Sequence, residues 1–310
     1  MAVSLIYDSM YLQHETGAHP ENARRLESIL KAIEKDESLS KRLVRRTPRP
    51  ANNDEIARCH REELVYHLES LCARGESFVD VDTRISPASF EVAKLAAGAA
   101  ITAIDAVMAE EGGRAFCVIR PPGHHATITN AMGFCLFNNA AIGARYAQAR
   151  YGVERVLIID WDVHHGNGTQ DIFWNDPTVF YFSTHQYPYY PGTGSADERG
   201  GGKGEGTTLN VPLPTGTPAR QHRHAFSDAL RQIEQRFPPD LIIISAGFDS
   251  RRGDPLGGLM LEDDDFSEMT KEVLEIAGKH AAGRVVGLLE GGYNLELLGG
   301  SAKSHIAALI

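Results

Sequence analysis

Two hydrophobic patterns alternate along the chain. Short, nearly continuous apolar runs rich in β-branched residues are typical of strands buried on both faces of a parallel sheet. Six such runs lie at residues 4–8, 115–121, 155–163, 178–186, 241–250 and 284–294. Longer stretches with helical spacing lie between or beside them, at residues 21–36, 90–110, 138–152, 223–237 and 264–280. This alternation predicts an α/β fold in which helices cover both sides of a mostly parallel sheet.

The chain shows no internal repeat and no low-complexity linker, so we expect residues 1–310 to form a single domain. The segment from Gly192 to Thr208 is rich in glycine and charge, which predicts a surface loop. No apolar run approaches the roughly 20 residues that span a bilayer. The first residues lack the basic flank and cleavage site of a secretion signal. We therefore expect a cytoplasmic protein that has no membrane partner.

Composition narrows the function only slightly. Hydrophobic residues make up 42% and charged residues 23% of the chain, which are ordinary globular values. The formal net charge of -10 disfavours non-specific binding of nucleic acid and is compatible with cationic substrates. The cysteines show no CxxC spacing, which argues against a disulfide framework or a thiolate zinc site. We expect buried, reduced thiols at Cys59, Cys72, Cys117 and Cys135.

Four of the predicted strands end in unusual polar groups. The run at 115–121 leads into PPGHHA, and the run at 155–163 leads into DWDVHHGNG. The run at 241–250 ends in AGFDS, and the run at 284–294 ends in EGGYN. Ligands of open α/β sheets bind outside the carboxyl ends of the strands. The four endings therefore predict one shared cleft.

The run DWDVHHGNG carries candidate metal ligands. Asp160, Asp162 and His164 alternate, so they face one way if the strand stays extended through them. These groups are costly to bury without a cation, and Asp249 ends a second strand in the same way. Such a set leaves positions open for water and substrate, which favours a catalytic zinc, although iron(II) or cobalt could use the same ligands. The alternative is a group of solvated polar residues leaving a strand. His165 faces away from His164 and is expected to serve packing.

The stretch RPPGHHA sets His124 and His125 side by side in a loop that its prolines make rigid. An open metal site can lower the pKa of water from about 16 toward about 7, and it then needs a proton acceptor. An imidazole that titrates near neutrality is the usual general base and acid. Asp160 can orient one of the two rings through a carboxylate hydrogen bond. The alternative is that one histidine of the pair is only structural.

The motif EGGYN contributes a further polar group. Its glycines, Gly291 and Gly292, let the backbone approach a ligand closely, and Tyr293 offers a phenol that can donate to a developing oxyanion. Taken alone, this tyrosine is more simply explained as a half-buried aromatic residue in a turn. Its place at the same sheet edge as the other groups favours the catalytic interpretation.

Six motifs together resemble the histone deacetylase superfamily, in the class II form shared with bacterial deacetylase-like amidohydrolases. They are RPPGHHA, GFCLFNN, DWDVHHGNGTQ, YYPGTG, AGFDSRRGDPLGG and LEGGYN, and the similarity begins at HPENARRL. The resemblance implies the arginase/deacetylase fold, a three-layer α/β/α sandwich around a mostly parallel sheet of about eight strands. It also implies zinc-dependent hydrolysis of N-acetyl-lysine or other acyl-lysine amides, which releases acetate or another carboxylate and the free lysine side chain.

Matching of the motifs implies a role for each site residue. The zinc ligands become Asp162, His164 and Asp249. The catalytic groups become His124 paired with Asp160, His125 as general base and acid, and Tyr293 as oxyanion donor. The substrate tunnel becomes Gly133, Phe134, Tyr190, Leu256 and Gly291, where the family more often has phenylalanine in place of Tyr190. Arg25 would line an internal cavity for acetate exit. A structural potassium ion maps to Asp160, Asp162, His164, Ser183 and Thr184, and a second one maps near Phe173 and Val179.

Two positions narrow the activity that the resemblance implies. Tyr293 is present, whereas weakly active relatives carry histidine there, so an intact enzyme is expected. Leu256 occupies the gatekeeper position of GDPLG, where acetylpolyamine-preferring relatives carry glutamate, and it favours acyl-lysine in a protein or peptide.

Three other readings of the same residues stay open. The first is an amidohydrolase that acts on acetylpolyamines or another small acylated amine. The second is a dinuclear manganese ureohydrolase, which the absence of further bridging carboxylates disfavours. The third is a non-catalytic acyl-lysine binding protein. The family likeness also allows a homodimer or a homotetramer.

Overall fold

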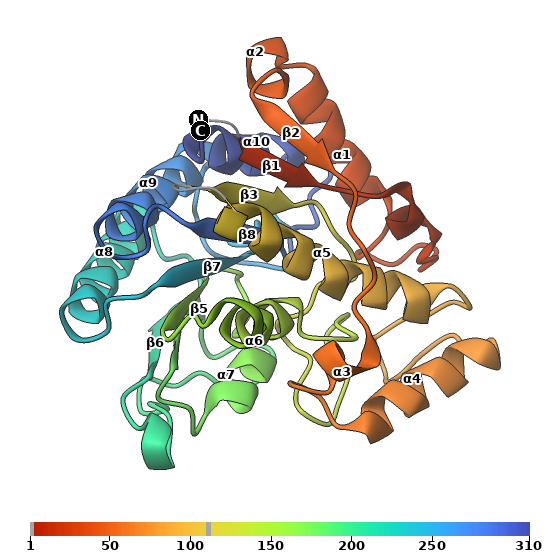
Figure 1. Cartoon of the computed structure of the whole chain (residues 1–310). Coiled ribbons are helices and arrows are strands. Elements are labelled where there is room, and N and C mark those ends of the chain that lie inside the picture. The colour runs from red at the N-terminus through yellow and green to blue at the C-terminus, as the bar shows by residue number, and fades with distance from the viewer. Residues whose placement is uncertain (1–2, 110–112) are drawn as a thin grey trace.

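A single parallel sheet forms the centre of the molecule (Figure 1). The computed structural model describes residues 3–109 and 113–310. Its eight strands follow the order β2-β1-β3-β8-β7-β4-β5-β6, and every neighbouring pair is parallel. The strands are β1 Val3–Ile6, β2 Leu43–Arg46, β3 Arg114–Cys117, β4 Val156–Asp160, β5 Val179–Gln186, β6 Thr208–Leu213, β7 Leu241–Ala246 and β8 Val285–Leu289.

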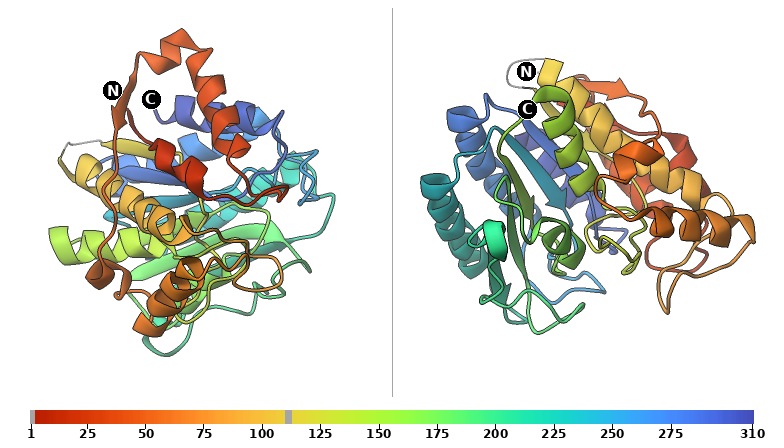
Figure 2. Two further views of the ribbon diagram at one scale, coloured as in Figure 1. Left: turned by 90° about the vertical axis from the view of Figure 1, so that its right-hand side faces the viewer. Right: turned by 60° about the horizontal axis from the view of Figure 1, so that its bottom comes forward.

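Helices cover both faces of this sheet (Figure 2). Helices α5 and α6 pack against each other and on β3, β8 and β7, while α1, α8, α9 and α10 form the layer on the other face. The longer helices are α1 Arg24–Glu34, α4 Glu62–Ala73, α5 Ser89–Ala109, α6 Asn139–Tyr151, α7 Asn167–Phe173, α8 Ala219–Arg236, α9 Asp263–His280 and α10 Leu298–Ala308. The short ones are α2 Glu37–Ser40, α3 Asn53–Ile56 and two 3-10 turns, η1 Ser9–Gln13 and η2 Gly202–Gly204. The predicted α/β/α sandwich is confirmed.

The strands form where the sequence is apolar on both faces. All eight residues of β5 are buried, as are all five of β4 and β8, because helices cover the sheet on each side. Each of the six predicted runs overlaps a strand, and each strand is shorter than its run; β1 and β3 begin one residue before the predicted runs. In particular, β4 ends at Asp160, so an extended strand does not continue through the DWDVHH segment as we assumed.

Helix α5 corrects an expectation about apolar runs. Its 21 residues are long and apolar enough, by length and composition, to cross a membrane. Fourteen of them are buried, including Leu95, Ile101 and Ile104, against the rest of the protein. Alanine and glycine fill much of its surface, and Gly98 lies directly against the backbone of Arg49. Its setting is that of a core helix packed on the sheet beside α6.

The four strand endings that carry polar motifs belong to neighbouring strands. β3, β8, β7 and β4 follow one another at the centre of the sheet, and their registers align Cys117 with Leu288, Leu289 with Ala246, and Ser245 with Asp160. Because all four strands are parallel, the segments that follow them leave the sheet at the same edge. The prediction of one shared site is therefore confirmed at the level of topology.

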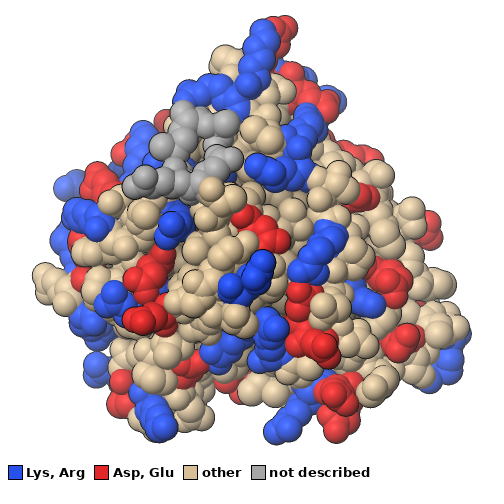
Figure 3. All heavy atoms as spheres, viewed as in Figure 1, with Lys and Arg blue, Asp and Glu red and all other residues tan. Residues whose placement is uncertain are grey.

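The remaining expectations concern the surface and the thiols. The Gly192–Thr208 segment contains the η2 turn and otherwise has no helix or strand before β6 begins at Thr208. All four cysteines are buried and unpaired. Basic and acidic side chains are interspersed over the face shown in Figure 3.

Candidate active site

Three donor groups converge just beyond the ends of β4 and β7. Nδ1 of His164 lies 3.0 Å from Oδ1 of Asp162 and 3.2 Å from Oδ2 of Asp249. A ligand atom from each residue lies within 4.8 Å of the other two. Although Asp249 Oδ2 is close to the imidazole, it is buried and accepts no hydrogen bond of acceptable geometry. An orphaned carboxylate oxygen beside two other donors fits a bound divalent cation.

The other oxygens of these carboxylates are held by backbone amides. The N–H of Gly291 donates to Asp162 Oδ2 at 2.7 Å, and the N–H of Val163 donates to Asp249 Oδ1 at 2.8 Å. A Cβ atom on Gly291 would lie 2.1 Å from Asp249 Oδ2 and 2.5 Å from Asp162 Oδ2. Only glycine therefore allows the backbone after β8 to approach both carboxylates.

A second group within the described residues has metal-ligating atoms, namely His124, Cys135 and Glu290. Its carboxylate is already satisfied, because Glu290 accepts the N–H groups of Gly123 and His124 and the hydroxyl of Ser245. Burial raises the pKa of the Cys135 thiol well above its ordinary value, which disfavours the thiolate that binds metals. This group is a hydrogen-bonded support of the PPGHH loop, and the group of Asp162, His164 and Asp249 fits a metal better.

His124 forms a buried dyad with a carboxylate. Its Nδ1 lies 3.0 Å from Oδ2 of Asp160, to which the hydroxyl of Tyr181 also donates. Burial opposes a charge on this ring, but Asp160, Asp162 and Glu290 outweigh burial and raise the pKa of His124 well above its ordinary value. The dyad thus favours a charged imidazole beside an ionised carboxylate.

His125 has the opposite environment. Its Nδ1 lies 2.8 Å from the amide oxygen of Asn167. This oxygen accepts a hydrogen bond from Nδ1–H, so in the neutral ring Nε2 carries no proton and can act as an acceptor. Burial, followed by the charges of His124 and His164, lowers the pKa of His125 well below its ordinary value. A neutral ring with a free acceptor nitrogen is the form that a general base requires.

Tyr293 is positioned by two contacts that the sequence did not suggest. The carboxylate of Asp254 accepts the backbone N–H groups of Tyr293 and Asn294, at 2.7 and 3.0 Å. The guanidinium of Arg25 stacks over the phenol ring, 4.9 Å from its centroid. Burial raises the pKa of the Tyr293 phenol well above its usual value, which keeps the hydroxyl proton available as a donor at neutral pH.

A narrow pocket of about 140 Å³ opens onto these groups. Its lining includes His125, His164 and Tyr293, and the predicted tunnel residues Gly133, Phe134, Tyr190 and Leu256. Tyr189 and Asp82 also line it, and neither was predicted. Gly291 does not belong to the lining, because it lies between the two carboxylates.

Aromatic rings form much of the pocket wall. Tyr189 stacks on His164 with an interplanar angle of 16°, and the ring of Tyr190 meets His125 edge to face. Phe134 meets Tyr293 edge to face and has a positive φ of 70°. Gly133 lies against His125, where a Cβ atom would be 2.5 Å from the ring. The wall therefore fits a thin, unbranched chain.

Several other predicted residues lie close to this centre. His165 is buried beneath the site, with its nitrogens 2.8 Å from the Thr193 hydroxyl and 3.1 Å from Gln170 Oε1, in agreement with a packing role. In the sheet, Ser183 pairs with Asp160. Thr184, Phe173 and Val179 are buried nearby in β5 and at the end of α7. The potassium sites and the acetate cavity at Arg25 stay predictions.

These features define the class of protein as an α/β/α enzyme with the polar groups of a hydrolytic centre and side chains that could hold a metal. The sequence model of the histone deacetylase domain matches residues 19–309. The chain belongs to the histone deacetylase family.

Relatives from plants, archaea and bacteria share much of this chain. It is 42% identical to the chloroplastic histone deacetylase 10 of Oryza sativa subsp. japonica, over 96% of this chain and 71% of that protein. It is 41% identical to a probable deacetylase of Archaeoglobus fulgidus, over 96% of this chain and 82% of that protein. It is also 41% identical to the histone deacetylase-like amidohydrolase of Pseudomonas aeruginosa, over 89% of this chain and 72% of that protein.

The fold is shared with a solved structure. The crystal structure of the HDA15 HD domain superposes with a TM-score of 0.94 and 37% sequence identity, covering 99% of this chain and 88% of that one. A match of this extent shows that the two chains share one fold.

Proposed function

We propose that this protein is a zinc-dependent deacylase that hydrolyses the side-chain amide of acetyl-lysine or another acyl-lysine. The observation that carries the proposal is the convergence of Asp162, His164 and Asp249 within 4.8 Å, at the end of a narrow pocket that His125 and Tyr293 also line. The family and the deacetylase names of the relatives support it.

A divalent cation bound to the three ligands would polarise the acyl carbonyl and make water more acidic. The chain's own groups complete the reaction. His125 accepts a proton from the attacking water at Nε2, a C–O bond forms at the acyl carbon, and the amide C–N bond breaks. His125 then returns the proton to the leaving amine nitrogen. His124, held by Asp160, orients and supports the water.

Tyr293 stabilises the charge that develops on the acyl oxygen. Its phenol keeps its proton because burial raises its pKa, so it can donate a hydrogen bond as the carbonyl becomes an oxyanion. The half-buried side chain of Leu256 and the aromatic rings of Phe134 and Tyr190 would hold the methylene stem of the lysine. The pocket volume of about 140 Å³ suits a linear chain and disfavours a branched amine.

The direct test is turnover of a panel of acylated lysine peptides by enzyme that has been stripped of metal and reloaded. We expect hydrolysis of at least one short-chain acyl-lysine, loss of rate on chelation, and recovery with zinc. Reloading with iron(II) or cobalt compares the other metals that these ligands accept. Turnover that survives complete metal removal, or no turnover of any acyl-lysine by zinc-loaded enzyme, would refute the proposal.

A second candidate function is hydrolysis of acetylated polyamines. It is favoured by Asp82, an acidic residue of the pocket lining that would attract a cationic amine tail. Leu256 argues against it, because an apolar residue at the pocket edge offers no charge to a second ammonium group. Rates on an acetyl-lysine peptide and on an acetylated diamine, measured side by side, decide between the two.

A further inference from the structure

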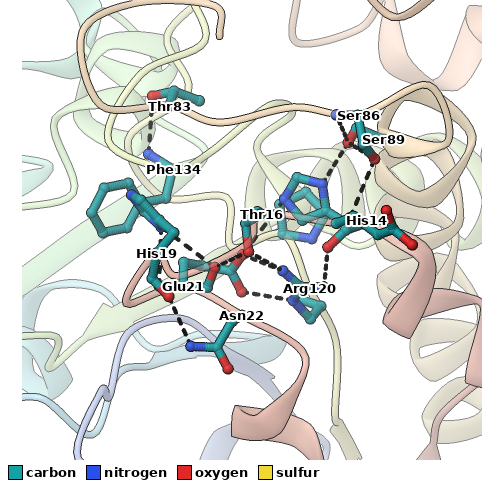
Figure 4. A network of polar contacts seen from close by, with 12 residues as sticks. His14, Thr16, His19, Glu21, Asn22, Thr83, Ser86, Ser89, Arg120 and Phe134 are labelled. Atoms are coloured by element: carbon teal, nitrogen blue, oxygen red, sulfur yellow. Dashed lines mark hydrogen bonds and ion pairs between the residues drawn. The ribbon is translucent and has the colours of Figure 1, made fainter. Parts of the chain in front are cut away.

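Glu21 lies buried between two arginines, Arg120 and Arg25, outside the candidate catalytic groups described above. Figure 4 shows Glu21 beside Arg120. Its carboxylate accepts two bonds from Arg120, from Nε at 2.8 Å and from Nη2 at 2.7 Å, and a third from Nη1 of Arg25 at 3.2 Å. All three side chains are at most 1% exposed. Burial would raise the pKa of Glu21, but the charge and hydrogen bonds of Arg120, with His14 and Arg25, outweigh it and keep the carboxylate ionised.

Each arginine is tied to a different catalytic loop. Arg120 directly precedes the PPGHH loop, and its Nη1 donates to the carbonyl oxygens of Tyr11 and His14. Arg25 reaches the EGGYN loop, where Nε donates to Gly292 O at 2.7 Å and Nη2 donates to Glu290 O.

The ends of both loops carry reactive groups. Four residues after Arg120 the chain reaches His124, and the guanidinium of Arg25 lies over the ring of Tyr293. Glu21 itself touches neither the pocket nor the candidate metal ligands. It is therefore suited to act on the chemistry only through its two arginines.

We propose that Glu21 is a positioning residue that sets the distance between the PPGHH and EGGYN loops by holding Arg120 and Arg25 on one carboxylate. The inference rests on the proposed function, because it assigns Tyr293 and the tandem histidines to the reaction. A single anion between two buried cations is needed here, since without it two guanidinium groups would repel each other in a dry interior. Arg25 would then shift, and the phenol beneath it would shift with it.

The test is the variant Glu21→Gln, which keeps the shape of the side chain and removes its charge. We expect kcat on the acyl-lysine peptide to fall roughly 10- to 100-fold, because sub-ångström misplacement of catalytic groups is costly, with KM within about twofold. The matched control is Glu55→Gln. Glu55 is also buried and accepts a bidentate pair from Arg49, at 2.9 and 2.6 Å, but it lies at α3, away from the pocket. This control is expected to lose thermal stability and keep kcat.

A double-mutant cycle separates positioning from general destabilisation. In the Tyr293→Phe background, the loss caused by Glu21→Gln should become several-fold smaller, because the displaced phenol is no longer there to be misplaced. If Glu21→Gln lowers kcat by the same factor with and without Tyr293→Phe, the proposal is overturned. Equal kcat losses in the Glu21 and Glu55 variants at equal loss of melting temperature would also overturn it.

A crystal structure of Glu21→Gln gives a readout that needs no activity. The proposal expects Arg25 to leave Gly292 O or Glu290 O, and an unchanged Arg25 would contradict it. If Glu21→Gln does not fold, Glu21→Asp keeps the charge on a shorter stem and should show an intermediate fall in kcat; an unchanged kcat in this folded variant would count against positioning. If the wild-type protein hydrolyses no acyl-lysine, the proposed function fails, while the crystal structure still decides the role of Glu21.

Discussion

Tyr293 is the residue whose contribution to catalysis can be isolated most simply. The phenol is buried, and its hydroxyl is not needed to hold the backbone, because Asp254 accepts the N–H groups of that loop. We expect Tyr293→Phe to lower kcat by roughly 10²- to 10³-fold, the usual loss of one oxyanion donor, with metal content unchanged. Steady-state kinetics together with metal analysis checks this. A rate near that of the wild type would remove Tyr293 from the mechanism.

Asn167 fixes the tautomer of His125 by accepting a hydrogen bond from Nδ1. Replacing it by aspartate puts a negative charge 2.8 Å from Nδ1 and should raise the pKa of His125, because a nearby anion favours the charged ring. A general base must be unprotonated, so a higher pKa moves the acid limb of kcat/KM toward higher pH, by about one unit or more. The pH–rate profile of Asn167→Asp measures the shift, and the exposed Asn175→Asp is the control. An unmoved acid limb would mean that His125 is not the base.

The motifs of the sequence indicate the candidate site residues but not the residues that support them, for a physical reason. His124, His125, Asp162 and Tyr293 occur in compact motifs whose residue types are costly to bury without a partner. Asn167 meets His125 across 42 residues, and Asp254 meets Tyr293 across 39. An asparagine or aspartate in a glycine-rich turn carries no local sign of such a partner, because the contact exists only after the strands align.

Among the strands and helices, too, some were predicted from the sequence and others were missed. Strands such as β4 and β5 were predicted because both of their faces are apolar. The edge strand β2, sequence LVRR, is half exposed and too short to show a pattern, and β6 mixes buried and half-buried positions directly after a glycine-rich segment. Helices α4, α7 and α10 were also missed. Of these, α10 is rich in small residues that give little helical periodicity.

The turn that follows β8 requires glycine at position 291. A methyl group at Gly291 would stand 2.1 Å from Asp249 Oδ2, so Gly291→Ala must displace a carboxylate or the strand end. We expect zinc affinity to fall at least about tenfold, in line with the loss of support around metal ligands. Calorimetric titration of the metal-free protein with zinc measures it.

Gly278→Ala is a matched control for that change. Gly278 lies within α9, and beyond the nearby backbone of its own helix and its chain neighbours no atom comes within 4 Å of the position of an added Cβ. The substitution should leave zinc affinity unchanged and raise stability by about 0.5–1 kcal/mol. Equal zinc affinity in the Gly291 and Gly278 variants would contradict the role given to the strand end.

The molecule as a whole buries several neutral histidines, which makes its stability depend on pH. In His60, Nδ1 donates to Thr127 O and Nε2 accepts the N–H of Asn138. Protonation of Nε2 would therefore set its new N–H against the N–H of Asn138. Burial lowers the pKa of His60 from 6.5 to about 4. Burial also lowers the pKa of His14 and of His185 to about 4, and the pKa of His222 and of His305 to about 3.

The sign of the effect follows from these pKa values. The unfolded chain takes up protons below about pH 6.5, whereas folded His60 resists them down to about pH 4. Its stability contribution is therefore complete above pH 6.5 and is lost as the pH falls to 4, by about 3 kcal/mol. Urea unfolding between pH 7.5 and 4.5 should show a falling free energy of unfolding. His60→Gln should make the free energy of unfolding less dependent on pH, whereas the exposed His224→Gln should not. An equal pH dependence in the wild type and both variants would refute the role given to His60.

The hydrogen bond from Gly291 to Asp162 joins β8 to β4 across the intervening β7, from which Asp249 follows. Any cation held by these carboxylates is thus tied to three central strands at once, and it can bind only while they are assembled. Metal occupancy and unfolding then become one linked equilibrium, in which ion at 100 times its dissociation constant adds about 2.7 kcal/mol to the folded state. The melting temperature becomes an assay in its own right. It should rank zinc, iron(II) and cobalt by affinity before any substrate is known, and a melting point indifferent to all three would argue against a metal at this site.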